Sequence, residues 1–184
     1  MRYVAIAGAV LALLLLLAVV RSYNGLVRRR NQADNAWAQV DVQLRRRYDL
    51  IPNLVETVKG YAAHEREVFE EVTNARAHAE AASGVQDQAR AENQLTAGIR
   101  RLIAVAENYP QLKANQNFLA LQEELTGTES RIAFARQFYN DQVMTLNTLI
   151  QSFPSRIVAT LGGFQQREFF DIEEPARGPV GVRF

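Results

Sequence analysis

The 184-residue chain contains no cysteine, which excludes disulfide bonds, thiolate metal sites, a cysteine nucleophile and a lipid-modified cysteine anchor. The chain has no large excess of positive or negative charge, because it contains 21 lysines and arginines and 20 aspartates and glutamates. A net charge of +1 produces no global field that would attract nucleic acid, so we predict no nucleic-acid partner. The length suits one soluble domain beside an N-terminal membrane segment.

The sequence also lacks a catalytic signature. It has no nucleophile elbow, no glycine-rich phosphate loop and no Glu-x-x-His motif of the kind that holds two irons in a bundle. His64, Glu67 and Glu71 share helical spacing, but the second histidine of the HExxH zinc motif is missing, so we favour a polar helix flank. We predict no catalytic residues, no cofactor and no metal site. A hydrolytic enzyme or a metal-binding bundle is the less favoured alternative.

The longest feature that is present is an apolar run. Every residue from Tyr3 to Val20 is apolar, aromatic, alanine or glycine. This length is about the minimum that crosses roughly 30 Å of hydrocarbon as a helix. A cleaved signal peptide is the alternative, but it would have a shorter apolar core and a small-x-small cleavage site. We therefore predict a retained transmembrane anchor at residues 1–21, whose apolar and interfacial residues include Tyr3, Leu11, Leu17, Val20 and Tyr23.

Basic residues flank this run unequally. Arg2 and the amino terminus precede it, whereas Arg21 and Arg28 to Arg30 follow it, opposed only by Asp34. Because loops rich in lysine and arginine stay on the cytoplasmic side, we predict a single-pass protein with its N-terminus outside and its main domain in the cytoplasm.

Four segments beyond the anchor repeat apolar residues at spacings of three and four, as one buried helix face requires, and none shows the sustained alternation of a strand. We predict an all-α fold: an N-terminal transmembrane helix, an elongated antiparallel four-helix bundle over residues 22–172 with a short C-terminal helix at Arg156 to Leu161, and a disordered tail at 173–184. The four helices are expected at residues 22–50, 52–82, 85–108 and 118–153, and the last is close to a heptad repeat.

Pro52 interrupts the first of these patterns. Proline has no amide hydrogen and disfavours the α conformation at the preceding residue, Ile51, so the chain either reverses or kinks here. We predict a reversal at Asp49 to Asn53. Gly25 leaves open whether the first helix is continuous with the membrane helix.

One tryptophan and three arginines of the first predicted helix lead to further predictions. Trp37 is the sole tryptophan and falls on the apolar face, so we predict that it anchors the core. Arg45, Arg46 and Arg47 point about 100° apart on a helix, which favours a solvated charge run. The alternative is that Arg47, which lies close to the seam, pairs with a carboxylate on a neighbouring helix.

The segment Asp41 to Glu65, DVQLRRRYDLIPNLVETVKGYAAHE, resembles the signature of the LemA family. Glu107 to Phe118, and Phe153-Pro154 with Gly163-Phe164, are similar to the same family, so the resemblance extends from Tyr23 to about Phe170. It implies a small membrane-anchored helical protein of the bacterial cell (inner) membrane. The family has no agreed biochemical activity and includes proteins of magnetosome membranes.

Two non-enzymatic functions follow from the predicted fold and the resemblance. We favour a scaffold that assembles with copies of itself and organises membrane, as the resemblance to magnetosome-membrane proteins implies. The alternative is a monomeric tethered adaptor that recruits a foreign protein, in keeping with a role in envelope homeostasis that the resemblance also implies. The expected partners are the lipid bilayer and further copies of the chain.

An apolar patch is the expected surface for self-association. The fourth predicted helix extends beyond the third, and the phenylalanines of the tail, together with Ile172, are expected to fold back on the bundle. The predicted interaction patch consists of Met144, Leu146, Leu149, Ile150, Phe153, Phe169 and Phe170.

Overall fold

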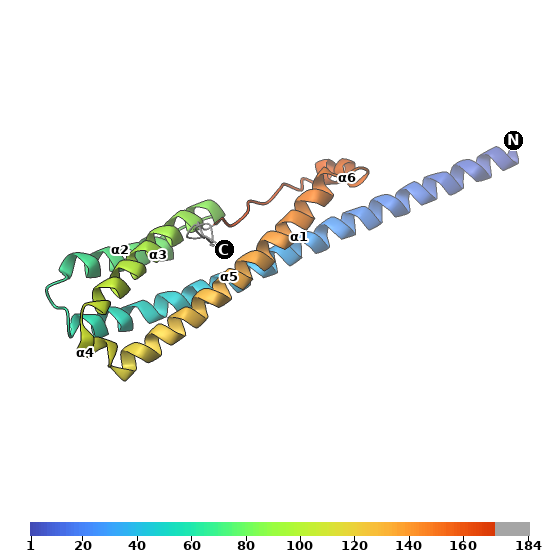
Figure 1. Cartoon of the computed structure of the whole chain (residues 1–184). Helices are drawn as coiled ribbons and strands as arrows, with labels where there is room; N and C mark the ends of the chain where they lie inside the picture. The colour runs from blue at the N-terminus through green and yellow to red at the C-terminus, as the bar shows by residue number, and fades with distance from the viewer. Residues whose placement is uncertain (172–184) are drawn as a thin grey trace, which may run out of the picture. The chain divides into compact units, whose positions relative to one another are not determined.

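The computed structural model describes residues 1–171, and within them the chain is all-α without a strand, which confirms the predicted fold class. Ile172 and the tail at 173–184, for which we predicted disorder, lie outside the described residues. The helices are shown in Figure 1: α1 (Arg2–Lys59), α2 (Arg66–Ala81), α3 (Val85–Glu107), α4 (Pro110–Lys113), α5 (Gln116–Gln151) and α6 (Ser155–Leu161).

α1 is one helix of 58 residues that contains both Gly25 and Pro52. The predicted reversal at Asp49 to Asn53 is therefore wrong, and the first helix is continuous with the apolar N-terminal segment. Inside a helix, Pro52 cannot donate to the carbonyl of Tyr48 four residues earlier. The side chain of Arg76 from α2 supplies the missing donor, because its Nε lies 2.8 Å from the Tyr48 carbonyl oxygen. A contact between helices thus satisfies the backbone where proline interrupts it.

The chain turns after Lys59 instead. The amides of Tyr61 and Ala62 both donate to the carbonyl of Val58, at 3.0 and 2.9 Å, and α2 begins only at Arg66. The helix predicted at 52–82 is consequently divided between the end of α1 and α2, and His64 lies in the connection.

Local signals set the remaining boundaries. Gly84 precedes α3 with a φ of +88°, a conformation that other residues rarely adopt. Pro110 occupies the first turn of α4, where its missing amide hydrogen costs no helical bond. Asn115 caps α5, because its Oδ1 accepts the amide hydrogens of Asn117 at 2.9 Å and Phe118 at 3.1 Å. As a result, α3, α5 and α6 begin and end within two residues of their predicted bounds.

The chain divides into two compact units, and α1 and α5 contribute to both. The first unit contains Met1–Val40 and Ala135–Glu168, and among the described residues the second contains Asp41–Phe134 and Phe169 to Asp171.

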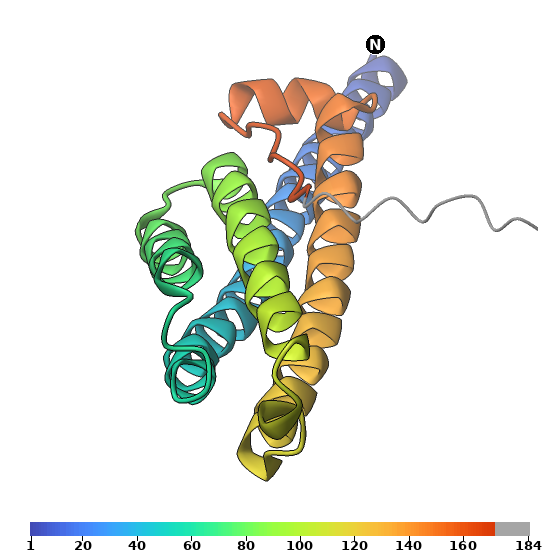
Figure 2. The ribbon, with the colours of Figure 1, turned by 60° about the vertical axis from the view of Figure 1, so that its left-hand side comes forward.

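In the second unit α2 and α3 run side by side, and α3 also meets α1 and the first half of α5 (Figures 1 and 2). α2 and α3 approach closely at Gly98, where a Cβ would lie 3.3 Å from Val72 Cγ2. The core of this unit is made of almost fully buried apolar side chains: Leu54, Val58, Val72, Leu95, Leu102 and Leu112. Each such side chain stabilises the fold by about 1.5 to 3 kcal/mol.

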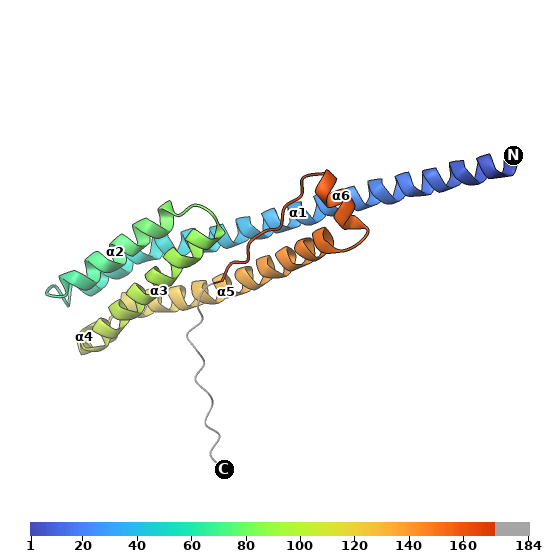
Figure 3. The ribbon, with the colours of Figure 1, turned by 90° about the horizontal axis from the view of Figure 1, so that it is seen from above.

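In the first unit the N-terminal part of α1 packs on the second half of α5, and α6 follows at the end of α5 (Figure 3). The buried residues of this seam are Leu26, Ala33, Ala36 and Val40 of α1 and Tyr139, Val143, Leu146 and Ile150 of α5. Trp37 is only half-buried, which corrects its predicted place in the core. Its ring packs on Tyr139 with 5.1 Å between centroids, at the edge of a seam whose centre is occupied by small alanines.

The apolar run forms the N-terminal part of α1, and the rest of the chain buries none of it. α1 is the one helix of the described residues that is long and apolar enough to cross a membrane. The predicted anchor residues are all exposed, as contact with lipid requires: Tyr3, Leu11, Leu17, Val20 and Tyr23.

Candidate functional site

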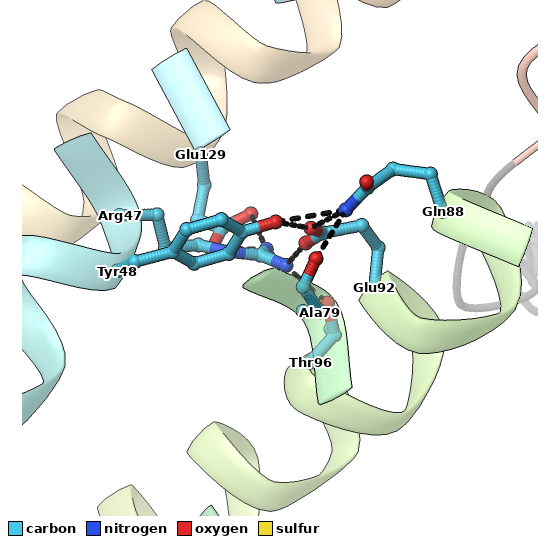
Figure 4. Close-up of polar contacts among 7 residues, drawn as sticks. All are labelled: Arg47, Tyr48, Ala79, Gln88, Glu92, Thr96 and Glu129. Carbon is cyan, nitrogen blue, oxygen red and sulfur yellow. Dashed lines mark hydrogen bonds and ion pairs between the residues drawn. The ribbon is translucent and has the colours of Figure 1, made fainter. Parts of the chain in front are cut away.

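A cluster of polar side chains lies inside the second unit (Figure 4). We call it the Arg47 network; it joins three helices and consists of Arg47 and Tyr48 of α1, Gln88, Glu92 and Thr96 of α3, and Glu129 of α5. Arg47 Nη2 pairs with Glu92 Oε2. Arg47 Nη1 donates to the two carboxylate oxygens of Glu129 at 2.8 and 3.0 Å and to Thr96 Oγ1 at 3.3 Å.

Glu92 is the central acceptor of the Arg47 network. Besides Arg47, its carboxylate accepts the hydroxyl hydrogen of Tyr48 and, at 2.8 Å, an amide hydrogen of Gln88. Gln88 Nε2 also lies 2.9 Å from the Tyr48 hydroxyl oxygen and 3.0 Å from the carbonyl oxygen of Ala79 in α2. These donors are needed because a buried carboxylate costs several kcal/mol unless it is paired and hydrogen-bonded.

The charges of this pair are removed from water, since the side chains of Arg47 and Glu92 are 1% and 0% exposed. Burial of the guanidinium acts to lower the pKa of Arg47, but Glu92 and Glu129 act in the opposite direction, and the pKa is raised. Burial and the charge of Glu92 raise the pKa of Tyr48 well above its usual value. Arg47 is therefore charged and Tyr48 neutral, the forms in which both donate to Glu92.

The three consecutive arginines have different environments. Arg45 pairs with Asp41 on the same helix at 3.0 Å, and Arg46 with Glu124 of α5 at 2.9 Å, both on the surface. The favoured prediction of a solvated charge run is wrong for Arg47, and the alternative of a pair with a neighbouring helix is confirmed.

The sequence prediction did not identify the carboxylates that hold Arg47. The burial of Glu92 could have been predicted from the sequence, because Glu92 precedes buried Leu95 and Ile99 at spacings of three and seven and so lies on the apolar face of α3. Glu129 could not have been identified in this way, since its half-exposed position is ordinary for a glutamate.

The Arg47 network is suited to holding helices together. Glu92 already accepts three donors, and Arg47 is held by two carboxylates from different helices. Within residues 1–171, no group of three histidine, aspartate or glutamate side chains could hold a metal ion, and this includes His64, Glu67 and Glu71. The network thus fixes the positions of α1, α3 and α5 along one another at Arg47.

The predicted interaction patch does not form one exposed surface. Leu146, Ile150 and Phe170 are buried within the chain, and Leu149 is half-buried. The exposed members are Met144, Phe153 and Phe169. The sequence placed the buried members outside because the spacing of α5 alone does not reveal that α1 covers this side of it.

An exposed face of α5 in the second unit is a further surface feature. A shallow depression on it is lined by Leu119, Gln122, Glu123, Thr126, Gly127 and Ser130. The exposed residues along the centre of this face follow heptad spacing, and we call them the α5 seam: Gln116, Ala120, Glu123, Gly127, Ser130 and Phe134. This spacing places the six residues on one side of α5, and Ala120, Gly127 and Ser130 among them are small.

The chain matches the LemA family over residues 36–184. Magnetosome protein MamQ of Magnetospirillum gryphiswaldense is 26% identical over 180 residues, an alignment that covers 84% of this chain and 66% of MamQ. Magnetosome proteins MamQ 1 and MamQ 2 of Paramagnetospirillum magneticum are similar to the same extent, so the chain spans 66% of the length of all three relatives. Because the family match contains the Arg47 network and every helix after α1, the chain belongs to the LemA family.

Proposed function

We propose that this protein is a non-enzymatic scaffold that is anchored in a membrane by the N-terminal part of α1 and associates with copies of itself. The exposed, apolar start of α1 supports the anchor. The family match and the names of the relatives, which are magnetosome proteins, support a structural role at a membrane. The arrangement of residues along the α5 seam is the observation that supports self-association.

The α5 seam is complementary to itself. Glu123 and Arg131 are exposed, lie four residues to either side of Gly127, and have no ion-pair partner within the described residues. A second copy that runs antiparallel, about a two-fold axis at Gly127, brings Glu123 of each copy beside Arg131 of the other. The same axis places Ala120 opposite Phe134, a small side chain beside a large one.

The axis falls where the two helices can approach most closely. Gly127 has no side chain, and, apart from the backbone of its own helix, the described residues leave the space within 4 Å of a Cβ at this position open. A parallel pair would instead place Glu123 opposite Glu123, which is repulsive. Charge and size therefore both favour the antiparallel pair. Because the second half of α5 runs antiparallel to the start of α1 in each copy, the anchors leave this pair in opposite directions, and the pair joins copies whose anchors lie in facing bilayers.

Disulfide cross-linking tests this pair, because the natural chain has no cysteine. In full-length protein in mild detergent, we expect Gly127→Cys to give a covalent dimer on oxidation, since residues at the axis can approach within the roughly 4.4 to 6.8 Å between Cα atoms that a disulfide needs. Ala120→Cys and Phe134→Cys alone should give little dimer, because their equivalent positions lie about 21 Å apart along the pair. A mixture of the two variants should give the mixed dimer.

Ala133→Cys is the matched control, because Ala133 is exposed on α5 but lies about 120° around the helix from Gly127. Dimers of Ala120→Cys alone and Phe134→Cys alone, without the mixed dimer, would show a parallel pair and contradict the proposed symmetry. A monomer that resists cross-linking at Gly127→Cys and binds a foreign protein would favour the adaptor alternative.

We also propose that the domain beyond the anchor faces the cytoplasm of a bacterial cell, with the membrane being the inner membrane. The basic residues after the apolar run support this orientation. Ser83 is exposed and lies between α2 and α3. An impermeant thiol reagent should label Ser83→Cys only after cells are opened, and labelling of intact cells would reverse the orientation.

A further inference from the structure

α6 presents its large apolar side chains outward. Ser155 and Ala159, which are small, face the protein and are buried. Ile157 and Leu161 lie four residues apart on the opposite side and are 54% and 84% exposed, and Phe153, which precedes the helix, is 82% exposed. Leu11 and Leu17 of the membrane segment are 60% and 56% exposed. The exposed fractions of the outward residues of α6 are therefore similar to those of the predicted lipid-facing residues. We call Phe153, Ile157 and Leu161 the α6 face.

α6 lies beside the point where the apolar run of α1 ends (Figure 3). Phe164, which follows α6, packs edge-on against Tyr23 with 5.6 Å between ring centroids, and the guanidinium carbon of Arg30 lies 5.5 Å from the same ring. Tyr23 is three residues beyond Val20, or about 4.5 Å along the helix. All these residues belong to the first unit, so Phe164, three residues after α6, lies against α1 between about one and three helical turns beyond the end of the membrane segment.

The two chain segments that meet here contain no acidic residue. None occurs before Asp34 in α1, and none occurs between Asp141 and Glu168, a stretch that includes all of α6. Arginines are present in both segments: Arg21, Arg28, Arg29 and Arg156 are exposed. Exposed apolar residues next to arginines, without carboxylates, match the chemistry of a bilayer surface, where acyl chains lie below lipid phosphates.

We infer that the α6 face inserts into the headgroup region of the same lipid bilayer that α1 spans, so that the protein has a second membrane contact beside its anchor. A lipid surface fits better than a protein partner because the exposed apolar residues of α6 lie close in the chain to Phe164, which contacts α1 just beyond the apolar run, and because both segments have arginines and no acidic residue. The inference rests on the membrane anchor of the proposed function. The second contact restrains the tilt and rotation of α1 relative to the membrane, since one spanning helix alone leaves both free.

Depth-dependent quenching tests the α6 face. Full-length single-cysteine variants carry a fluorescent label in vesicles of phosphatidylcholine and phosphatidylglycerol, with a nitroxide on either the upper or the lower part of the acyl chain. Leu161→Cys and Ile157→Cys should be quenched by both nitroxides, more strongly by the upper one, because interfacial helices insert by roughly 5 to 10 Å. Leu17→Cys in α1 reports the anchor, and Gln39→Cys, exposed on α1 about 28 Å beyond Val20, is the control that should stay in water.

The outcomes separate the two contacts. Quenching at Leu17→Cys without quenching at Leu161→Cys and Ile157→Cys overturns the α6 contact and leaves the anchor intact. Absence of quenching at Leu17→Cys contradicts the anchor of the proposed function, and the α6 contact with it. Labels at α6 that are shielded from both lipid nitroxides and aqueous iodide, increasingly so at higher protein density, would show that a second copy covers the α6 face and would also overturn the inference.

Discussion

Arg47→Ala is expected to lower the free energy of unfolding by about 3 to 5 kcal/mol, because it leaves the carboxylate of Glu92 buried without its cation. Glu129 would lose the same partner, although it is half-exposed and can be hydrated. Urea unfolding of the full-length protein in detergent, followed by circular dichroism, measures the change as a shift of the midpoint.

Arg45→Ala is the matched control for this loss. Arg45 is two residues away on the same helix, and its side chain is 74% exposed beside Asp41. Its removal should change the free energy of unfolding by no more than about 0.5 kcal/mol. Equal effects of the two substitutions would show that Arg47 is hydrated and would contradict the buried network.

The double replacement Arg47→Met with Glu92→Leu separates the cost of an unpaired charge from the contribution of the pair. Apolar residues that replace both partners of a buried ion pair are often tolerated, so the double variant should be more stable than Arg47→Ala. It should remain below the natural protein, because the Tyr48 hydroxyl loses its acceptor at a cost of about 1 to 3 kcal/mol for a buried group left unsatisfied, whereas Gln88 keeps the carbonyl of Ala79.

Phe170→Ala is expected to lower the free energy of unfolding by about 3 to 5 kcal/mol, the usual cost of removing a fully buried phenylalanine. Phe170 is 0% exposed and follows α6 in a segment without regular secondary structure. Its side chain belongs to the core of the second unit, so its removal leaves a cavity there.

Phe169→Ala controls for the loss of an aromatic ring at the same place in the chain. Phe169 is 42% exposed, so its replacement should cost only about six-tenths as much, in proportion to the apolar area that it buries. The same urea titration compares the two variants. A larger loss at Phe169→Ala than at Phe170→Ala would reverse the assignment of the buried ring.

The features that could be predicted from the sequence depend on neighbours along the chain. The apolar run of α1, the ends of α3 at Gly84 and Pro110, and the cap of α5 at Asn115 all arise from residues within a few positions of each other. The all-α fold follows in the same way, because the period of three and four persists over each helix.

The predictions that failed concern positions where a residue meets another helix. Trp37 has the spacing of a core residue, but the neighbouring alanines let α5 approach and leave the indole at the edge. Leu146 and Ile150 have the composition of an exposed apolar patch, but they face α1 in the first unit. The spacing of apolar residues predicts on which side of a helix a side chain lies, but it does not predict which other helix covers that side.

The sequence by itself determined the helices and the apolar segment that can cross a membrane. Only the tertiary structure decided that α1 continues through Pro52, because the donor that replaces the proline amide at the Tyr48 carbonyl comes from Arg76, 28 residues after Tyr48. It also decided that Arg47 is buried while Arg45 is solvated, since Glu92 and Glu129 are 45 and 82 residues away. Both outcomes depend on polar atoms of residues that lie far away in the sequence on other helices. The spacing of apolar residues in α1 contains no information about those atoms.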